Sequence, residues 1–220
     1  MFETDGMFGH RILHVFDDAV MPLRCAFCGT RTRGQERSVC ADCHDDMPWI
    51  APTSTADPFC VAVAPLAYEF PVDAAIKALK FKRRLWYGPA LAELACRHID
   101  ALPDDIDAVL PVPLHWRRRW RRGFNQAGEI ARPVARQLGV PLIGGVRRVR
   151  ATRPQSGLPA GERHRNVRGA FVARGRCRAR HVLIVDDVIT TGATIIQLGS
   201  AVLDSGAEKV SVLAVARAGY

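Results

Sequence analysis

Two hydrophobic periodicities alternate along most of the chain, beginning near residue 60. Short, nearly continuous apolar runs are typical of buried strands, and they occur at 61–68, 106–112, 144–150, 169–173, 181–185 and 209–216. Between them, apolar residues recur at helical spacing and predict helices at 71–81, 89–99, 125–138 and 191–205. Pro133 is expected to kink or interrupt the third of these helices. Strands that alternate with helices predict an α/β fold with a mostly parallel sheet.

The first 60 residues follow a different pattern. Residues 7–20 have apolar side chains at roughly helical spacing, which predicts a short helix before a cysteine-rich segment. Residues 51–58 (APTSTADP) are rich in Pro, Ser and Thr, a composition typical of linkers. We therefore expect three parts, with an N-terminal module over 1–50, a linker over 51–60 and the α/β domain over 61–220.

The overall composition is that of an ordinary globular protein, with 48% hydrophobic and 24% charged residues. The apolar runs are far shorter than the ~20 residues that cross a bilayer. Residues 1–13 carry Glu3 and Asp5 and lack the continuous apolar stretch of a secretory signal. These features argue against membrane insertion and export, and they predict a cytoplasmic protein.

Positive charge is concentrated in one stretch. The formal net charge is +9, but residues 111–180 hold 18 arginines, no lysine and only two acidic residues, Glu129 and Glu162. That stretch is therefore +16, and the rest of the chain is −7. A basic block of this kind indicates an anionic partner such as phosphate, a nucleotide or nucleic acid. The alternative is an ordinary solvated surface in an Arg-rich chain.

Four cysteines have the spacing of a metal site. Cys25 and Cys28 form one C-x-x-C pair, and Cys40 and Cys43 form a second pair after eleven intervening residues. Two such turns supply four thiolates for a tetrahedral zinc site, and four protein ligands leave no open position, so the predicted zinc is structural. The alternatives are a redox pair and four unrelated cysteines; a redox motif would not need the second pair.

The most specific stretch runs over 182–194 and reads VLIVDDVITTGAT. Four apolar residues predict a buried strand, Asp186 and Asp187 follow it, and a Thr- and Gly-rich turn then opens a helix. A helix N-terminus offers free backbone N–H groups to a phosphate, and Gly192 permits close approach. The two carboxylates can accept hydrogen bonds from sugar hydroxyls or hold Mg²⁺. The alternative is an acidic turn that precedes an ordinary threonine-capped helix.

This run resembles the signature that binds phosphoribosyl pyrophosphate (PRPP) in type I phosphoribosyltransferases. The preceding blocks CAFCG…CADC, AIKALKFKRR, VLPVPLHWRRRWRRGFNQA and RATRPQSGLPAGERHRNVRGAFV are similar, in this order, to those of the ComF family of competence-associated phosphoribosyltransferase homologues. The similarity covers residues 25–220. It implies a type I phosphoribosyltransferase-like α/β fold, a mostly parallel sheet flanked by helices, with a small N-terminal zinc-binding module of four cysteines.

The resemblance also assigns roles to particular residues. The catalytic acids, which bind the ribose hydroxyls of PRPP with Mg²⁺, are Asp186 and Asp187. The turn that holds the 5′-phosphate consists of Thr190, Thr191, Gly192, Ala193 and Thr194. A second loop, at 111–114, holds pyrophosphate through Val112, Pro113 and Leu114. A mobile loop over 151–168 closes on the site with Arg153, Gln155, Arg163 and Asn166. The alternative for this loop is a surface excursion whose arginines bind nucleic acid.

The implied reaction is glycosyl transfer from PRPP to an unidentified acceptor, a nucleobase or an amine, with release of pyrophosphate. Three functional interpretations stay open: an active phosphoribosyltransferase, a non-catalytic factor that handles single-stranded DNA and only senses PRPP, and a structural or regulatory PRPP-binding module. Partners in the DNA-uptake machinery follow from the competence association. The sequence does not assign a role to Lys77, Lys80 or Lys82.

One segment favours nucleic acid. Aromatic rings among arginines are typical of surfaces on which bases stack while phosphates are neutralised. The candidate contact residues are Trp116, Arg117, Arg118, Trp120 and Arg121.

Overall fold

The computed structural model describes residues 24–32, 38–51, 59–149 and 169–219. The chain divides into two compact units, Met1–Asp46 and Met47–Tyr220. The division falls four residues before the end of the N-terminal module expected from the sequence. The helix expected at 7–20 and the mobile loop expected at 151–168 lie outside the described residues.

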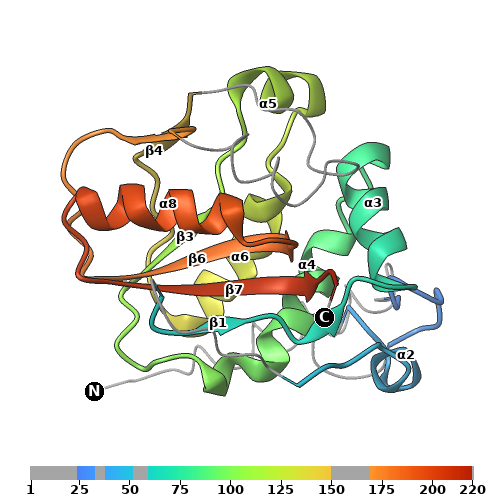
Figure 1. The fold of residues 1–220 in the computed structure, drawn as a ribbon. Coiled ribbons are helices and arrows are strands. Elements are labelled where there is room, and N and C mark those ends of the chain that lie inside the picture. Colours follow the sequence, from blue (N-terminus) through green and yellow to red (C-terminus); the bar gives the residue numbers. More distant parts are fainter. Residues whose placement is uncertain (1–23, 33–37, 52–58, 150–168, 220) are drawn as a thin grey trace, which may run out of the picture. The chain divides into compact units, whose positions relative to one another are not determined.

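The larger unit is built on one parallel sheet (Figure 1). Its strands are β1 (Ala62–Val63), β2 (Leu66–Ala67), β3 (Ala108–Pro111), β6 (His181–Ile189) and β7 (Lys209–Arg217). They lie in the order β1-β7-β6-β3, and β2 also pairs with β7. The mostly parallel sheet predicted from the sequence is therefore confirmed.

The edge strand expected at 61–68 is split in two. β1 and β2 pair with β7 in one common register, Ala62 opposite Val212 and Leu66 opposite Ala216. Between them lies Pro65, which has no N–H to donate to a ladder. The proline thus interrupts the pairing without shifting the register.

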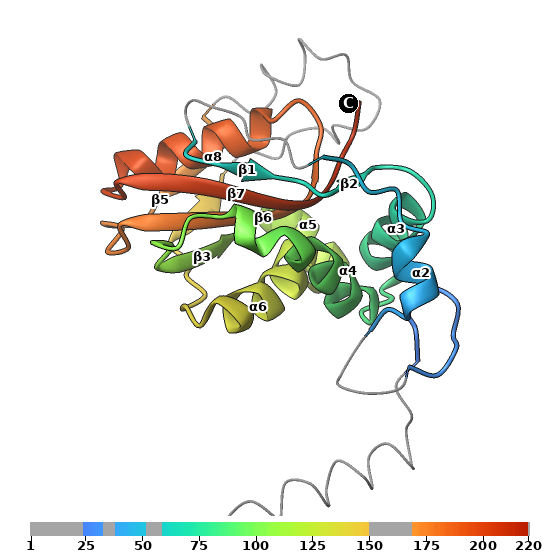
Figure 2. The ribbon, with the colours of Figure 1, turned by 90° about the horizontal axis from the view of Figure 1, so that it is seen from below.

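Helices cover both faces of the sheet (Figures 1 and 2). α4 (Tyr87–Ala95) and α6 (Gln126–Leu138) pack on each other and against the sheet, and α3 (Val72–Lys82) packs on α4. On the opposite face, α8 (Ala193–Asp204) also contacts a separate antiparallel pair, β4 (Val146–Arg148) and β5 (Phe171–Ala173). The remaining helices are α2 (Ala41–Asp45), the 3₁₀ helix η1 (Cys96–Ala101) and α5 (Trp116–Arg122).

The alternation of β6 decides where its acidic residues lie. Val182 and Ile184 belong to the apolar cluster formed with Leu198 of α8. Because successive side chains of a strand point to opposite faces, Asp186 follows on the α8 side and Asp187 on the other. The two acids therefore approach the end of the sheet from its two faces.

Three expectations need correction. α6 runs through Pro133 without interruption, because its buried face continues on both sides of the proline with Ile130 and Val134. The helix expected at 89–99 begins two residues earlier and becomes 3₁₀ after Ala95. The basic segment 116–122 forms α5, although the apolar pattern predicted no element there. None of its residues is buried, so the helix has no periodic apolar signal in the sequence.

No helix among the described residues has both the length and the apolar character needed to span a membrane.

Candidate functional site

Asp186 and Asp187 lie in the part of β6 that extends beyond its pairing with β3. β3 pairs with β6 only as far as Val185, whereas β6 continues to Ile189 beside β7. Both acids are buried. The Asp187 amide donates to Asp186 Oδ1 at 2.9 Å, and the Val188 amide donates to Asp187 Oδ1 at 3.0 Å. One oxygen of each carboxylate is thereby fixed, which leaves the other for a cation or a hydroxyl.

Lys80 of α3 interacts with the carboxylate of Asp187. Its ammonium group forms an ion pair with Asp187 Oδ2. Burial would lower the pKa of Lys80, but the negative charges of Asp187 and then Asp186 outweigh it, so this pKa is raised. The lysine is therefore held as a cation at the acidic pair.

Asp186 is in a different electrostatic situation. Burial, followed by the adjacent charge of Asp187, raises the pKa of Asp186 well above its ordinary value. Lys80 opposes this shift but does not cancel it. The pair is thus short of positive charge, and carboxylate oxygens are the hard ligands that Mg²⁺ prefers. The donor set fits a magnesium ion or the hydroxyls of a bound sugar.

The turn after β6 has the form of a phosphate cradle. Gly192 caps α8 with a left-handed backbone (φ 73°), a conformation that favours glycine, and its carbonyl accepts the first helical bond, from the Ile196 amide at 2.9 Å. The first amides of a helix have no intrahelical partner. Thr191 Oγ1 accepts from the Ala193 amide at 3.5 Å, and the side chains of Thr190 and Thr194 are partly exposed. Backbone and hydroxyl donors therefore converge at this turn.

The loop at 111–114 offers few amides to an anion. Pro111 and Pro113 have no N–H. The Val112 amide donates to the Val185 carbonyl at 2.9 Å, and the Val112 carbonyl accepts from Asn125 Nδ2 at 3.0 Å. Among the described residues this leaves the Leu114 amide as the loop's one unengaged donor. An anion at this loop would need cationic side chains as well.

Such side chains are present, and the sequence patterns did not single out all of them. Arg118 and Arg122 lie one turn apart on α5 and are both about half buried, which lowers the pKa of each. The charge of Asp187 opposes the shift at Arg122. Arg148 of β4 is buried over the Phe171 ring; burial and then Arg118 lower its pKa to about 10, while Asp186 acts against them. Lys80, Arg122 and Arg148 thus act electrostatically on the acidic pair, and Arg118 acts on Arg122 and Arg148, so the four cations form one group beside it.

α5 and α3 are joined at their C-terminal ends. Arg83 Nε donates to the Arg122 carbonyl at 3.0 Å, where a cation also suits the helix dipole. The Arg122 guanidinium lies 5.6 Å from the Phe81 ring centroid and donates to Gln126. This contact fixes the helix that supplies Lys80 beside the helix that supplies Arg118 and Arg122.

The residues proposed for nucleic acid divide between two faces of α5. Arg118 faces inward, whereas Trp116 and Trp120 are 65% and 87% exposed. Arg117 and Arg121 are also exposed, and the Arg117 guanidinium lies 5.2 Å from the Trp116 ring centroid. The exposed members form a surface, and Arg118 belongs to the site. The predicted loop residues Arg153, Gln155, Arg163 and Asn166 lie outside the described residues.

One signal could have identified Lys80 from the sequence. It continues the i, i+4 series of Val72 and Ile76 on the buried face of α3, where a lysine is out of place unless it has a partner. Lys77, by contrast, pairs with Asp73 at 2.6 Å, and Lys82 is exposed. Arg148 carried no comparable signal, because its burial depends on the pairing of β4 with β5.

The smaller unit brings its four cysteines together. The Sγ atoms of Cys25, Cys28, Cys40 and Cys43 all lie within 4.8 Å of one another. Tetrahedral zinc with Zn–S bonds of ~2.3 Å separates its sulfurs by about 3.8 Å, so the set fits such an ion. The first turn is closed by the Gly29 amide donating to the Cys25 carbonyl at 2.9 Å, with Gly29 at a left-handed φ of 77°. The four thiols could hold a metal such as zinc.

A second polar cluster lies at the opposite end of β6. His181 Nδ1 contacts Asp105 Oδ1 at 2.6 Å, and its Nε2 contacts Ser211 Oγ at 2.9 Å. The order Asp–His–Ser is that of a hydrolytic triad. Ser211 is fully buried, however, so no substrate can reach its hydroxyl. This cluster is a structural network that ties β6 to β7 and to the loop before β3.

Comparison with known proteins agrees with this geometry. The chain matches the phosphoribosyl transferase domain family over residues 122–219, which include the acidic pair and the phosphate turn. It is 34% identical to the DNA utilization protein YhgH of Salmonella typhi over 205 residues, 88% of this chain and 89% of that protein. The protein of the same name from Escherichia coli K12 is also 34% identical, over 207 residues. Competence protein F of Haemophilus influenzae is 37% identical over 163 residues, 69% of this chain and 70% of that protein. With its phosphoribosyltransferase domain and its four-cysteine cluster, the chain therefore belongs to the ComF family.

Proposed function

We propose that this protein binds PRPP with Mg²⁺ and transfers its phosphoribosyl group to an acceptor, with release of pyrophosphate, in a process linked to DNA uptake or nucleotide metabolism. The observation that carries the proposal is the acidic pair Asp186–Asp187 between a helix N-terminus and a group of four cations. PRPP presents the matching features in one molecule: a 5′-phosphate, two ribose hydroxyls and a pyrophosphate group.

Each part of PRPP has a counterpart in the site. The 5′-phosphate binds at the turn 190–194, where amides and threonine hydroxyls converge. Asp186 Oδ2 and Asp187 Oδ2, the second also paired with Lys80, accept from the ribose 2′- and 3′-hydroxyls. The pyrophosphate binds beside Leu114 against the cationic group. Mg²⁺, when bound, neutralises pyrophosphate charge and orients the oxygens that it ligates.

The chemistry requires positioning more than a protein nucleophile. The bond between ribose C1 and the pyrophosphate oxygen breaks, and its electron pair leaves with pyrophosphate. A nitrogen lone pair of the acceptor forms the new bond to C1, and that nitrogen then loses its proton. Arg118, Arg122 and Arg148 stabilise the charge that develops on pyrophosphate. Lys80 pairs with the Asp187 carboxylate and holds it in place, so it is a positioning residue.

The four-cysteine cluster is proposed to hold one structural zinc. Burial first, and the neighbouring thiols next, raise the pKa of Cys43, so four thiolates at this spacing need a dication to coexist. Zinc binding would supply that charge and stabilise the smaller unit.

A second candidate function is the handling of single-stranded DNA, with PRPP sensed and not consumed. It is favoured by the exposed face of α5, where Trp116 and Trp120 lie among Arg117 and Arg121. The names of the relatives, DNA utilization protein and competence protein, agree with this function. The two functions are compatible, because they use different faces of one helix.

A PRPP turnover assay tests the first function. Pyrophosphate release is followed with Mg²⁺, with and without nucleobases and single-stranded DNA, while calorimetry measures PRPP affinity. Asp186→Ala/Asp187→Ala should lose roughly 1.5–3 kcal/mol of binding for each lost charge-assisted hydrogen bond. Equal PRPP affinity in both proteins would refute the assignment of the site. Binding without pyrophosphate release from any acceptor would refute the transferase and leave the sensing function.

A further inference from the structure

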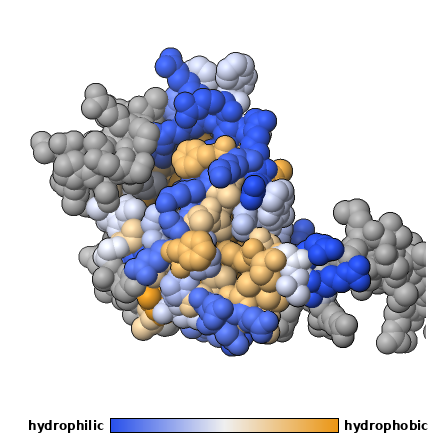
Figure 3. Space-filling model, turned by 90° about the vertical axis from the view of Figure 1, so that its right-hand side faces the viewer, coloured by the Kyte–Doolittle hydropathy of each residue, from blue (hydrophilic) through white to orange (hydrophobic). Residues whose placement is uncertain are grey.

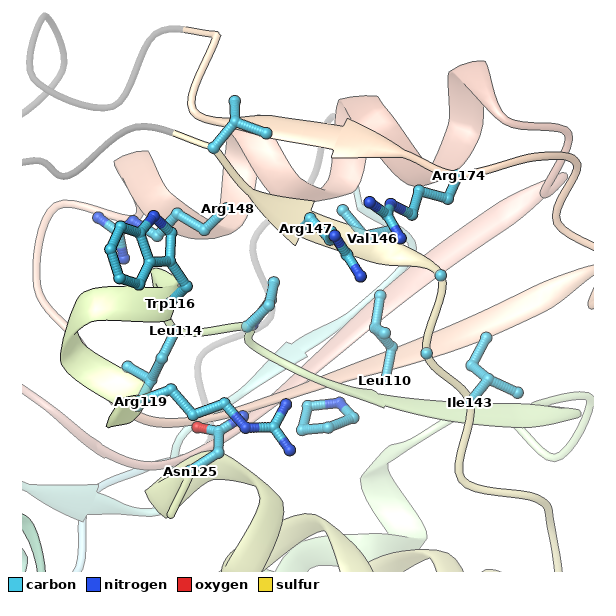
Figure 4. A pocket seen from close by; sticks show the side chains of 15 residues that line it. Leu110, Leu114, Trp116, Arg119, Asn125, Ile143, Val146, Arg147, Arg148 and Arg174 are labelled. Carbon is cyan, nitrogen blue, oxygen red and sulfur yellow. The ribbon is translucent and has the colours of Figure 1, made fainter. Parts of the chain in front are cut away.

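A cavity lies beside the end of β3 (Figure 4). It has a volume of about 760 Å³, within the range of ligand sites. Its walls are the end of β3 with the loop that follows, α5, Asn125, and the segment 143–149 that includes β4. Asp186, Asp187 and the turn 190–194 do not line it. The cavity therefore lacks the acidic pair and the 5′-phosphate turn, and it borders the proposed pyrophosphate position, with which it shares Pro113, Leu114 and Arg148.

Among the described residues, all charged side chains that line this cavity are positive: four arginines line it and no acidic residue does. Arg119 of α5 and Arg147 of β4 extend into the space from opposite walls, with Arg174 near one end (Figure 4). Within the described ranges, no hydrogen bond or ion pair engages the guanidinium of Arg119, Arg147 or Arg174. Like charges converging on one space repel, and an anion placed between them removes that repulsion.

The rest of the lining points to an anion with a planar ring. Leu110, Ile143 and Val146 give the cavity an apolar wall, and Trp116 presents a mostly exposed indole at its edge. An indole stacks readily with a nucleobase. Arg117 already covers part of Trp116 from outside, which orients the ring.

We propose that this cavity is a nucleotide-binding site, which takes a nucleoside 5′-phosphate with the phosphate between Arg119 and Arg147 and the base against Trp116 and the apolar wall. The ligand is a free nucleotide that binds in addition to PRPP. A nucleotide in this cavity contacts the loop at 111–114, which also adjoins the acidic pair. Binding of the nucleotide can therefore change the affinity of the PRPP site.

The test is calorimetry on the full-length protein with AMP, adenosine and inorganic phosphate as probes. Because AMP shares its ribose 5′-phosphate with PRPP, it is titrated in saturating PRPP and Mg²⁺, and again into Asp186→Asn/Asp187→Asn. We expect one AMP per chain in both experiments, with at least tenfold weaker binding of adenosine and of phosphate. Loss of all AMP binding in both experiments would overturn the proposal, since AMP would then occupy only the PRPP site.

Two variants assign the binding to the cavity by different means. Arg119→Ala/Arg147→Ala removes the anion contacts. Gly144→Leu fills the space without removing charge, since a Cβ at Gly144 has no atom within 4 Å and its φ is not left-handed. Each should weaken AMP at least tenfold and leave PRPP affinity unchanged. Arg97→Ala/Arg178→Ala, which removes two exposed arginines outside the cavity, is the matched control.

The outcomes separate this site from the PRPP site. If AMP binding survives both cavity variants, the proposal is wrong, whatever becomes of PRPP. If inorganic phosphate binds as well as AMP, the cavity is an anion site and the nucleotide assignment fails. If only single-stranded DNA binds and its affinity falls in both variants, the cavity belongs to DNA and the free-nucleotide proposal also fails. Failure of PRPP binding alone would refute the proposed function and leave the nucleotide site standing.

Discussion

Lys80 and Asp187 form an ion pair that connects the last turn of α3 to the end of β6. The carboxylate is buried, and the lysine side chain is only 21% exposed. Removing one partner of a buried pair leaves an uncompensated charge, whereas removing both does not. The pair therefore links the stability of the α3–β6 contact to the charge of the proposed PRPP site.

Lys80→Met is expected to destabilise the protein by about 3 kcal/mol, the low end for breaking a buried pair, because Lys80 is partly exposed. Urea unfolding measures this loss. Lys80→Met/Asp187→Asn should recover most of the stability but not the PRPP affinity, since the ribose still lacks its acceptor. Lys77→Met is the matched control on the same helix and should change stability little. A double variant no more stable than the single one would show that the pair is not the cause.

Much of this fold could be predicted from local sequence, and the reasons are physical. The apolar run before Asp186 and the glycine turn after it place a strand, an acidic pair and a helix N-terminus within 13 residues, so β6, α8 and the phosphate turn follow from short-range pattern. The sequence also predicts the four-cysteine cluster, since C-x-x-C turns need no distant partner.

The cations of the site could not be predicted without the fold. Arg148 is buried by the pairing of β4 with β5. Arg122 acts electrostatically on Asp187, and the Arg83 hydrogen bond to Arg122 joins α3 to α5. α5 itself has no apolar face, so hydrophobic periodicity does not detect it. Large apolar side chains in or next to α3 are also exposed; they are Phe70, Phe81, Leu85 and Trp86. Figure 3 shows hydrophobic and hydrophilic residues side by side on one face of the molecule.

The buried network at the start of β6 makes a second prediction. Since Asp105 is a carboxylate, His181 Nδ1 donates to it, and His181 Nε2 is hydrogen-bonded to the Ser211 hydroxyl. Ser211→Ala leaves Nε2 buried without a hydrogen-bond partner and should cost roughly 1–3 kcal/mol of unfolding free energy. Ser200→Ala, on a partly exposed face of α8, is the control and should cost less. Equal losses in thermal unfolding would contradict the argument.

Asp105 gives this network a pH dependence. Hydrogen bonds from Lys209 and then His181 lower the pKa of Asp105 to about 2. A carboxyl whose pKa is lowered by folding stabilises the native state above its unfolded pKa of ~3.9, and that contribution disappears as pH falls from about 4 to about 2. Asp105→Asn should therefore unfold more easily than the parent protein at pH 5, with the difference shrinking toward pH 2. The exposed neighbour variant Asp104→Asn should show no such convergence.

Metal removal should affect one unit. Binding of zinc contributes free energy to the structure that surrounds it, so chelation is expected to loosen residues 25–46 and to spare the sheet of the larger unit. Hydrogen exchange measures both. Elemental analysis should find one zinc per chain in reduced protein, none in Cys40→Ser/Cys43→Ser and an unchanged amount in Cys60→Ser, whose thiol is exposed and outside the cluster. Metal-free protein with an ordered cluster would rule out the zinc site.

Substitutions on the two faces of α5 should affect PRPP binding and DNA binding separately. Arg118→Ala/Arg122→Ala removes two half-buried cations of the group beside the acidic pair, so it should weaken PRPP binding and leave single-stranded DNA binding nearly unaffected. Arg117→Ala/Arg121→Ala removes exposed cations and should do the reverse. If both contact phosphates, the slope of log affinity against log salt should flatten by about 1.4, since each neutralised phosphate of a single strand contributes about 0.7.

The indole of Trp120 tests whether DNA is stacked on this face or only attracted to it. Stacking releases no counterions, so Trp120→Ala should cost roughly 1–3 kcal/mol of DNA binding at an unchanged salt slope. Trp86→Ala, an exposed tryptophan outside α5, is the control. A generic basic surface would lose nothing at Trp120 while still responding to Arg117→Ala/Arg121→Ala. If those arginine substitutions instead weaken PRPP and leave DNA binding intact, both faces of α5 belong to the mouth of the PRPP site, because the exposed arginines would then act on pyrophosphate.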